Sequence, residues 1–268
     1  MLKKNMLNLL KVAKRFAQKY PDAIFFDVGA NIGLFTYYIV RINKKCHCFE
    51  PHPNYFNILK IRLVLLKIEK IFKNKIVLPT INQLGVSKEI GSLFLNFSSL
   101  PGSHSFIKED TPSPTNQKCL SNITTLDNYF KMNQIPKKPI FIKIDIEGFE
   151  ENAILGCMSV IKKYRPTFFI EVRKGKNKSK NTFDKVCKIL MPHGYKIVNE
   201  QTEISKNKSE IIDILFCDKN FWDLNDICGD WEAINKKQKF FRIFKRLFRF
   251  ELADLHHLAI RKPYKVDY

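Results

Sequence analysis

The stretch from Ile24 to Ile42 constrains the fold more than any other part of the chain. An apolar run begins at Ile24, and Asp27 stands at the carboxyl end of the strand that this run predicts. Gly29 and Gly33 bracket a short turn, and the apolar residues after Gly33 predict a helix. Glycine has no Cβ, so the backbone can turn sharply there and approach a ligand. A strand, a glycine turn and a helix form the first half of a nucleotide-binding βαβ unit.

The turn lacks part of the dinucleotide fingerprint G-x-G-x-x-G, because Asn31 and Thr36 stand where glycines would be needed. An acid before the turn, Asp27, also suits an amine-bearing ligand better than a diphosphate. Glu50 ends the next short apolar strand, about 20 residues beyond Gly29, where an acid commonly meets a ribose. These residues favour an adenosine ligand without a pyrophosphate, such as S-adenosylmethionine. An NAD-dependent dehydrogenase is the alternative.

Four motifs in chain order resemble the FkbM-type methyltransferases, and the resemblance runs from about Ile24 to Val172. They are Asp27–Gly33, Phe49–Pro53, Thr125–Asp127 and Lys143–Glu150. The resemblance implies a class I enzyme that uses S-adenosylmethionine, in a family known for O-methylation of sugars and natural products. It therefore implies a hydroxyl acceptor on a saccharide, a glycoconjugate or a similar small molecule. RNA methylation and a non-catalytic cofactor-binding scaffold are further alternatives.

The order of elements predicts an α/β fold with a seven-stranded mixed sheet and helices on both faces. The last two strands have no helix between them, which fits the antiparallel hairpin that closes class I methyltransferase sheets. We expect an N-terminal helix in residues 1–20, a methyltransferase domain in 21–218 and a basic amphipathic extension in 219–268. Within the domain we expect strands at 24–26, 46–49, 76–78, 91–97, 140–146, 166–172, 195–198 and 211–216. We expect helices at 34–42, 53–67, 150–164 and 181–191, and a long loop at 98–118.

The strand at 140–146 carries the predicted catalytic residues. Isoleucines alternate with Phe141, Lys143 and Asp145, and a charge inside a central strand is costly unless it is paired or lines a cleft. Asp145 and Glu147 lie at the carboxyl end of this strand, where ligands bind in open α/β sheets. We expect these acids to act on the acceptor hydroxyl and Lys143 to tune their charge. The alternative is a structural Lys143–Asp145 pair with helix-capping acids.

The remaining site residues are assigned to the cofactor and, more weakly, to the acceptor. For the methionine end and the ribose we expect Asp27, Gly29, Asn31, Gly33 and Glu50. In class I methyltransferases a polar residue after the third strand commonly meets the adenine, which implies Asn82 or Gln83. The weaker acceptor-site residues are His104, alternatively a solvated loop histidine, and Asp127, alternatively a first-turn helix acid. No metal-ligand set is predicted, although a divalent metal that activates the hydroxyl is a second option.

Charge and cysteine content bear on partners and location. The seven cysteines have no metal-ligand spacing, so a reduced, cytoplasmic setting is expected, with Cys46 and Cys48 in the core. The net charge of +20 fits a lysine-rich background, an anionic membrane or a nucleic-acid partner, of which nucleic acid is the least favoured. Residues 236–250 combine a phenylalanine-rich half with a basic half, the pattern of a peripheral membrane anchor. A helix packed on the domain is the alternative for this segment.

Overall fold

The computed structural model describes residues 4–72, 76–174, 181–204 and 210–218. For residues 4–5, 199–204 and 210 it describes the backbone alone. The predicted basic amphipathic segment at 236–250, and with it the whole predicted extension at 219–268, lies outside the described residues.

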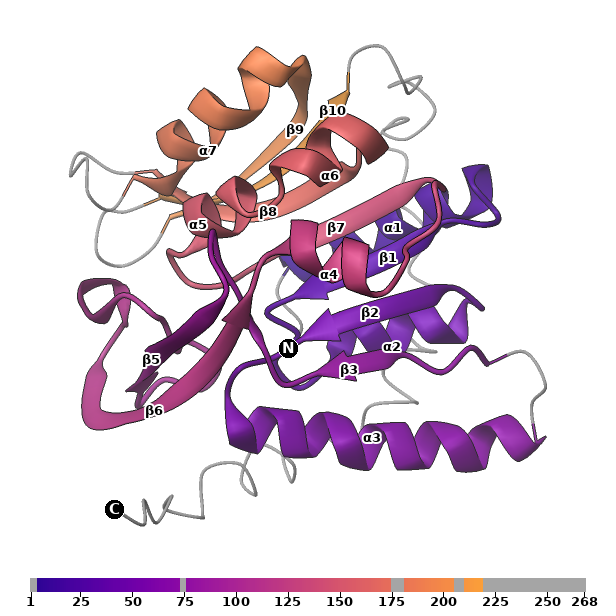
Figure 1. The fold of residues 1–268 in the computed structure, drawn as a ribbon, viewed down its shortest axis with the longest axis horizontal. Helices are drawn as coiled ribbons and strands as arrows, with labels where there is room; N and C mark the ends of the chain where they lie inside the picture. The colour runs from indigo at the N-terminus through magenta and orange to yellow at the C-terminus, as the bar shows by residue number, and fades with distance from the viewer. Residues whose placement is uncertain (1–3, 73–75, 175–180, 205–209, 219–268) are drawn as a thin grey trace. The chain divides into compact units, whose positions relative to one another are not determined.

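The main sheet has seven strands in the order β3-β2-β1-β7-β8-β10-β9 (Figure 1). The parallel pairings join β1, β2, β3, β7 and β8, whereas β10 runs antiparallel to both β8 and β9. This order, with one reversed strand, is the predicted class I methyltransferase sheet, and the prediction is confirmed. The strands are β1 (Ile24–Val28), β2 (Lys45–Phe49), β3 (Thr80–Asn82), β7 (Ile140–Ile144), β8 (Thr167–Lys174), β9 (Tyr195–Ile204) and β10 (Glu210–Asp218).

Helices cover both faces of this sheet. One face, with Phe26, Ile142 and Phe168, forms the larger core with side chains from four helices: α4 (Leu126–Met132), α5 (Glu150–Leu155), α6 (Met158–Tyr164) and α7 (Thr182–Leu190). The opposite face, with Phe25 and Phe141, meets α1 (Lys4–Lys19), α2 (Leu34–Arg41) and, over β2 and β3, α3 (Pro53–Phe72). The alternation of side chains along buried strands accounts for the two cores.

The predicted N-terminal helix is present as α1, and it covers the sheet. The ring of Phe16 lies 5.9 Å from that of Phe25 and 5.3 Å from that of Phe141, measured between centroids. Phe16 is fully buried, as expected from the helical spacing of the apolar residues in this segment. These contacts show that α1 covers the sheet.

A second sheet corrects the predicted loop at 98–118. Its strands are ordered β4-β6-β5, with β4 (Gly85–Val86), β5 (Gly91–Ser98) and β6 (Pro114–Thr124). Strand β5 was predicted, but the start of β6 was assigned to the loop, which in fact ends before Pro114 and contains the 3-10 turn η1 (Lys108–Asp110). Residues 115–118 are polar and largely exposed, so the strand arises from pairing with β5 rather than from an apolar alternation.

Two other boundaries differ from expectation. The predicted strand at 76–78 is wrong, since the chain pairs with β2 only after Pro79, through Thr80 to Asn82. The predicted helix at 150–164 divides into α5 and α6 at Gly156. A Cβ on Gly156 would lie 1.9 Å from the carbonyl oxygen of Ser87, so the break admits a close backbone contact. The 3-10 turn η3 (Met191–His193) follows α7.

Candidate functional site

The turn after β1 lies directly against the segment after β7. Gly29 has φ 78°, and a Cβ there would lie 1.9 Å from the carbonyl oxygen of Asp145. The amides of Gly29 and Ala30 both donate to the carbonyl oxygen of Phe49, at 3.1 and 2.9 Å. Only glycine meets both the conformational and the steric demand at position 29. The ends of β1, β2 and β7 therefore form one contiguous edge, where ligands bind in open α/β sheets.

Glu50 is held at this edge by two backbone amides. Its Oε2 accepts a hydrogen bond from the amide of Asn31 at 2.7 Å, and its Oε1 accepts one from the amide of His52 at 2.9 Å. Burial raises the pKa of Glu50 to about 7, although both amide hydrogen bonds act in the opposite direction. The two hydrogen bonds orient a carboxylate that is otherwise costly to bury.

Lys143 forms a buried network beneath the turn. The register places Lys143 opposite Asp27 on the neighbouring strand, so both side chains lie on the same face. The Lys143 Nζ donates to the carbonyl oxygen of Gly29 at 2.8 Å and lies 3.1 Å from Asp27 Oδ1 and 3.4 Å from Asp145 Oδ2. Burial lowers the pKa of Lys143, but the two carboxylates more than offset this and hold it above its ordinary value. The ammonium is therefore charged at neutral pH.

The carboxylate of Asp27 faces protein groups. It is fully buried, and its Oδ2 accepts hydrogen bonds from the Thr36 hydroxyl at 2.7 Å and the Thr36 amide at 3.2 Å. With Lys143 on its other oxygen, this side chain ties α2 to β7. Such contacts favour support of the turn over direct contact with a cofactor.

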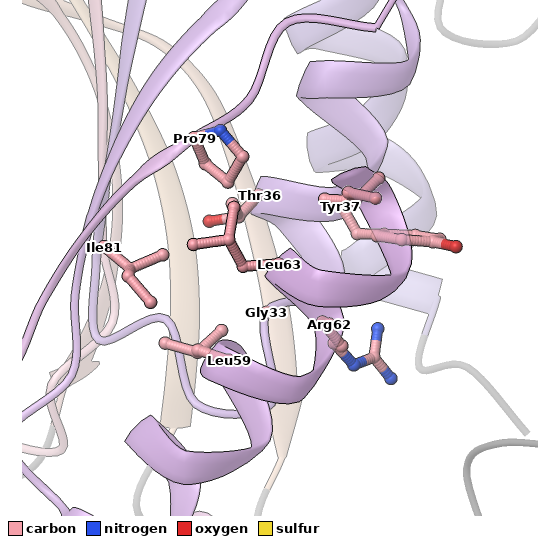
Figure 2. Close-up of a pocket in the computed structure, with 9 residues that line it drawn as sticks. Gly33, Thr36, Tyr37, Leu59, Arg62, Leu63, Pro79 and Ile81 are labelled. Atoms are coloured by element: carbon pink, nitrogen blue, oxygen red, sulfur yellow. The ribbon is translucent and has the colours of Figure 1, made fainter. Parts of the chain in front are cut away.

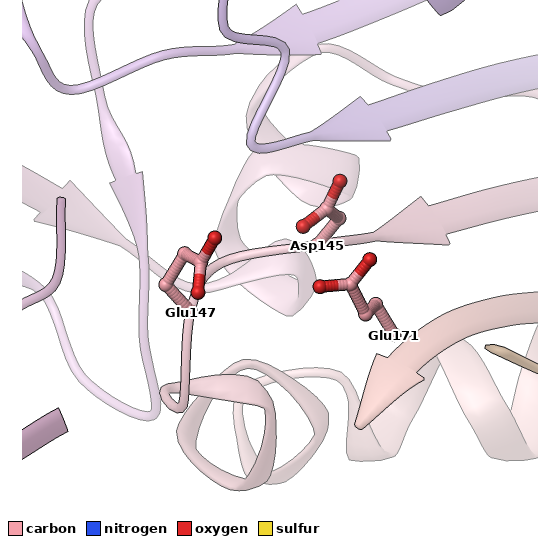
Figure 3. Close-up of side chains that lie close together, drawn as sticks. All are labelled: Asp145, Glu147 and Glu171. Atoms are coloured by element: carbon pink, nitrogen blue, oxygen red, sulfur yellow. The ribbon is translucent and has the colours of Figure 1, made fainter. Parts of the chain in front are cut away.

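Three carboxylates gather at the carboxyl ends of β7 and β8 (Figure 3). Single oxygens of Asp145, Glu147 and Glu171 lie within 4.8 Å of one another, close enough to share a metal ion. Carboxylate oxygens are the ligands that Mg²⁺ and Ca²⁺ prefer. Arg173 borders the group, with its Nη2 2.5 Å from Glu147 Oε2, and the Lys143 Nζ lies 3.4 Å from Asp145 Oδ2.

The loop between β5 and β6 connects the two halves of this edge. At one end, a Cβ on Gly102 would lie 2.3 Å from the Asn31 Nδ2, and the Gly102 amide donates to the Tyr55 hydroxyl at 2.8 Å. At the other end, the Ser105 hydroxyl donates to the carbonyl oxygen of Glu147 at 2.8 Å. Arg173 Nη1 donates to the carbonyl oxygen of Asp110 at 3.1 Å. The loop therefore touches both the turn after β1 and the acidic group.

His104 belongs to this loop and stacks on His52, with ring centroids 4.3 Å apart. Burial lowers the pKa of His104 to about 4, so the ring is neutral at physiological pH. Its Nδ1 accepts a hydrogen bond from the Ser98 amide at 2.9 Å, which leaves the proton on Nε2. In this state the free ring nitrogen donates a hydrogen bond, which does not suit a general base.

The other expected residues lie as follows. Asn82 ends β3 beside Glu50. The amide of Glu50 donates to the carbonyl oxygen of Asn82 at 3.0 Å, and the side chain of Asn82 donates to the carbonyl oxygen of Cys48 at 2.9 Å. Gln83 follows it and is exposed. Asp127 accepts hydrogen bonds from the amides of Ser159 and Val160, both at 2.9 Å, at the start of α6. These hydrogen bonds favour the structural alternative for Asp127, a first-turn helix acid, over a role in the acceptor site.

Comparison with known proteins places this geometry in a family. The methyltransferase FkbM domain profile matches residues 27–197, which is most of the chain and takes in the three acids, Glu50 and the glycine turn. The chain belongs to the FkbM methyltransferase family. No curated protein shows significant similarity to it.

Solved structures similar to this FkbM chain include three named methyltransferases, all of low identity. An FkbM methyltransferase from Methylobacillus flagellatus KT has a TM-score of 0.47 and 18% identity, over 71% of this chain and 42% of that chain. An rRNA methylase from Streptococcus thermophilus has a TM-score of 0.44 and 9% identity, over 81% of this chain and 98% of the other. The magnesium protoporphyrin IX methyltransferase of Synechocystis PCC 6803, with bound SAM, has a TM-score of 0.44 and 10% identity, over 80% of each chain.

Two residues of the candidate site, Glu171 and Arg173, are not among those expected from the sequence, and both lie on β8. Their spacing of two within a strand puts both side chains on one face, which is the signal that could have found them. Pairing of Ile144 with Ile170 then brings that face beside Asp145.

A separate small pocket lies between α2 and α3 (Figure 2). It is lined largely by apolar side chains around Gly33, where a Cβ would lie 2.4 Å from Leu59 Cδ2. Gly33 therefore permits close packing of α3 on the turn. None of the three acids lines this pocket, so we place the candidate site of the FkbM domain at the sheet edge.

Proposed function

We propose that this protein transfers the methyl group of S-adenosylmethionine to a hydroxyl on a saccharide, glycoconjugate or similar small molecule. The observation that carries the proposal is the shared sheet edge, where Glu50 stands beside the glycine turn after β1 and three acids lie at the carboxyl ends of the next two strands, β7 and β8. Membership in a methyltransferase family favours this over the dehydrogenase alternative.

In this proposal each group has a defined task. Glu50 accepts hydrogen bonds from the ribose hydroxyls, and the turn from Gly29 to Gly33 approaches the methionine end. Asn82 or Gln83 meets the adenine. Methyl transfer needs the acceptor oxygen in line with the sulfonium methyl, and holding both partners supplies much of the rate. Asp145 or Glu147 removes the hydroxyl proton, and the Lys143 ammonium, 3.4 Å from Asp145 Oδ2, balances the charge of Asp145.

The charge around the acceptor position supports an uncharged acceptor. The acids Asp145, Glu147 and Glu171 meet there, with two cations beside them, Lys143 at Asp145 and Arg173 at Glu147. A phosphate backbone placed against these carboxylates meets like charge, which weakens binding. A polyol instead offers hydroxyl donors to the same oxygens. The acids therefore favour a sugar hydroxyl over RNA.

The deciding experiment incubates the protein with methyl-labelled S-adenosylmethionine and separate small-molecule, glycan, lipid and RNA fractions of the cell. We expect label in a glycan or small-molecule fraction. Label confined to RNA would make RNA the acceptor in place of a saccharide, and cofactor binding without label in any fraction would support the scaffold alternative.

Repeating the reaction with EDTA and then with added Mg²⁺ or Mn²⁺ tests whether the three acids work through a metal. Loss and recovery of label would assign them as ligands.

The pKa of Glu50 predicts how cofactor binding depends on pH. Ribose hydroxyls bind the ionised carboxylate more strongly than the acid, and half of the free protein carries the acid at about pH 7. Affinity for S-adenosylhomocysteine, measured by calorimetry, should therefore rise about tenfold from pH 6 to pH 8. Glu50→Gln should flatten this profile, and Glu50→Ala should weaken binding by roughly 1–3 kcal/mol. An unaltered profile in Glu50→Gln would remove Glu50 from the binding site.

A further inference from the structure

The outer side of α3 carries an apolar surface that no described element covers. Its side chains are between 42% and 81% exposed, and they are Ile61, Val64, Leu65, Ile68, Ile71 and Phe72. At 100° per residue they form one continuous stripe about a third of the circumference wide. We call these six residues the α3 stripe.

The stripe is distinct from the face by which α3 packs on the domain. That face contains Tyr55, Ile58, Leu59 and Leu66, which are buried against the sheet and the neighbouring turn. A helix with two apolar faces is normally buried on both of them. Figure 1 shows this long helix beside β3, and its second face is exposed within the part of the chain that the structure describes.

The charges beside the stripe indicate the kind of partner. Lys60, Lys67 and Lys70 are exposed on the adjacent side of the helix. The single acid of α3, Glu69, is already paired with Arg41 at 2.5 Å. An apolar stripe with a basic border is the pattern of a helix that lies in the interface of an anionic bilayer.

Two other occupants fit the charges less well. A second copy of this chain would bring the same lysines and a second charge of +20 to the contact. The sequence segment 236–250 has a phenylalanine-rich half, but it too is strongly basic.

Among the described residues no helix is long and apolar enough to span a bilayer. We propose that the α3 stripe docks the domain reversibly on an anionic membrane surface.

The test measures sedimentation of the full chain with vesicles of phosphatidylcholine alone and with about one-third phosphatidylserine. The docking variant is Ile61→Gln, Ile68→Gln and Phe72→Gln. Glutamine leaves the net charge of the protein unchanged and is compatible with a helix. The control is Ile90→Gln, Phe94→Gln and Leu120→Gln. These three side chains are 65%, 50% and 64% exposed, and they lie just before β5, on β5 and on β6. We expect binding to the anionic vesicles only, weakened about tenfold or more in the docking variant and less than about twofold in the control.

A second variant, Phe72→Trp, keeps the stripe apolar and reports its surroundings directly. Its fluorescence should shift to the blue when anionic vesicles are added, beyond any shift of the unaltered protein. Failure of the full chain to bind vesicles, equal binding by the docking variant, or no additional shift would overturn the proposal. Dimerisation in solution that the docking variant abolishes would instead assign the stripe to a second copy.

Discussion

The Asp145→Asn variant is expected to lose methyl-transfer turnover by about 10²–10⁴-fold, the usual contribution of a positioned acid or base. Its affinity for S-adenosylhomocysteine should stay within about threefold of the unaltered protein. The amide keeps the shape of the side chain but can neither accept the hydroxyl proton nor bind a cation strongly. Single-turnover kinetics with saturating cofactor measure the first quantity, and calorimetry measures the second.

Glu151→Gln is the matched control for this experiment. Its carboxylate is 34% exposed, as is that of Asp145, and it also pairs with a lysine, Lys185, at 3.0 Å. It lies outside the acidic group, so turnover should remain unchanged. If Asp145→Asn also leaves turnover unchanged, Asp145 is only a structural partner of Lys143.

Lys143→Met should destabilise the fold by about 3–5 kcal/mol, because it leaves a buried carboxylate without its counter-charge. Asp27 has no exposed surface, and Thr36 hydrogen-bonds only one of its oxygens. For a domain of this size the loss corresponds to a fall in Tm of roughly 6–20 °C. Thermal and urea unfolding, followed by circular dichroism, measure both quantities.

Two comparisons show whether the loss comes from the buried charge. Adding Asp27→Asn should recover about 1–3 kcal/mol, since the amide is neutral and still accepts from Thr36. Lys185→Met removes a half-exposed ammonium from its pair with Glu151, and should cost at most about 1 kcal/mol. Equal losses in Lys143→Met and Lys185→Met would contradict the network described around Lys143.

The fold was predictable where local pattern and burial agree. Alternation along the strand at 140–146 identified both faces of β7, and the register then paired Lys143 with Asp27. The missing helix between the last two strands predicted the reversed β10. Pairing between strands that are distant in the sequence could not be predicted in this way. Residues 115–118 form a strand because β5 lies beside them, and nothing in their polar composition indicates it.

The site was predictable residue by residue only at strand ends. The motif from Lys143 to Glu150 located Asp145 and Glu147, but Glu171 joins them through the pairing of β8 with β7. The roles of side chains depended on partners distant in sequence. Asp127 reads as a helix acid or a site residue until the amides of Ser159 and Val160 are seen to occupy both of its oxygens.

The contact between Gly29 and the carbonyl of Asp145 has a consequence for exchanging parts among relatives. Backbone meets backbone there, so no side chain is available to absorb a mismatch. A chimera that takes the glycine turn from one protein and the segment after β7 from another inherits two surfaces that were shaped separately. The two segments therefore form one transplantable module, together with the loop that touches both of them through Gly102 and Ser105. Arg173 of β8 contacts the same module, since it pairs with Glu147 and donates to the carbonyl oxygen of Asp110, so it should be exchanged together with the three segments.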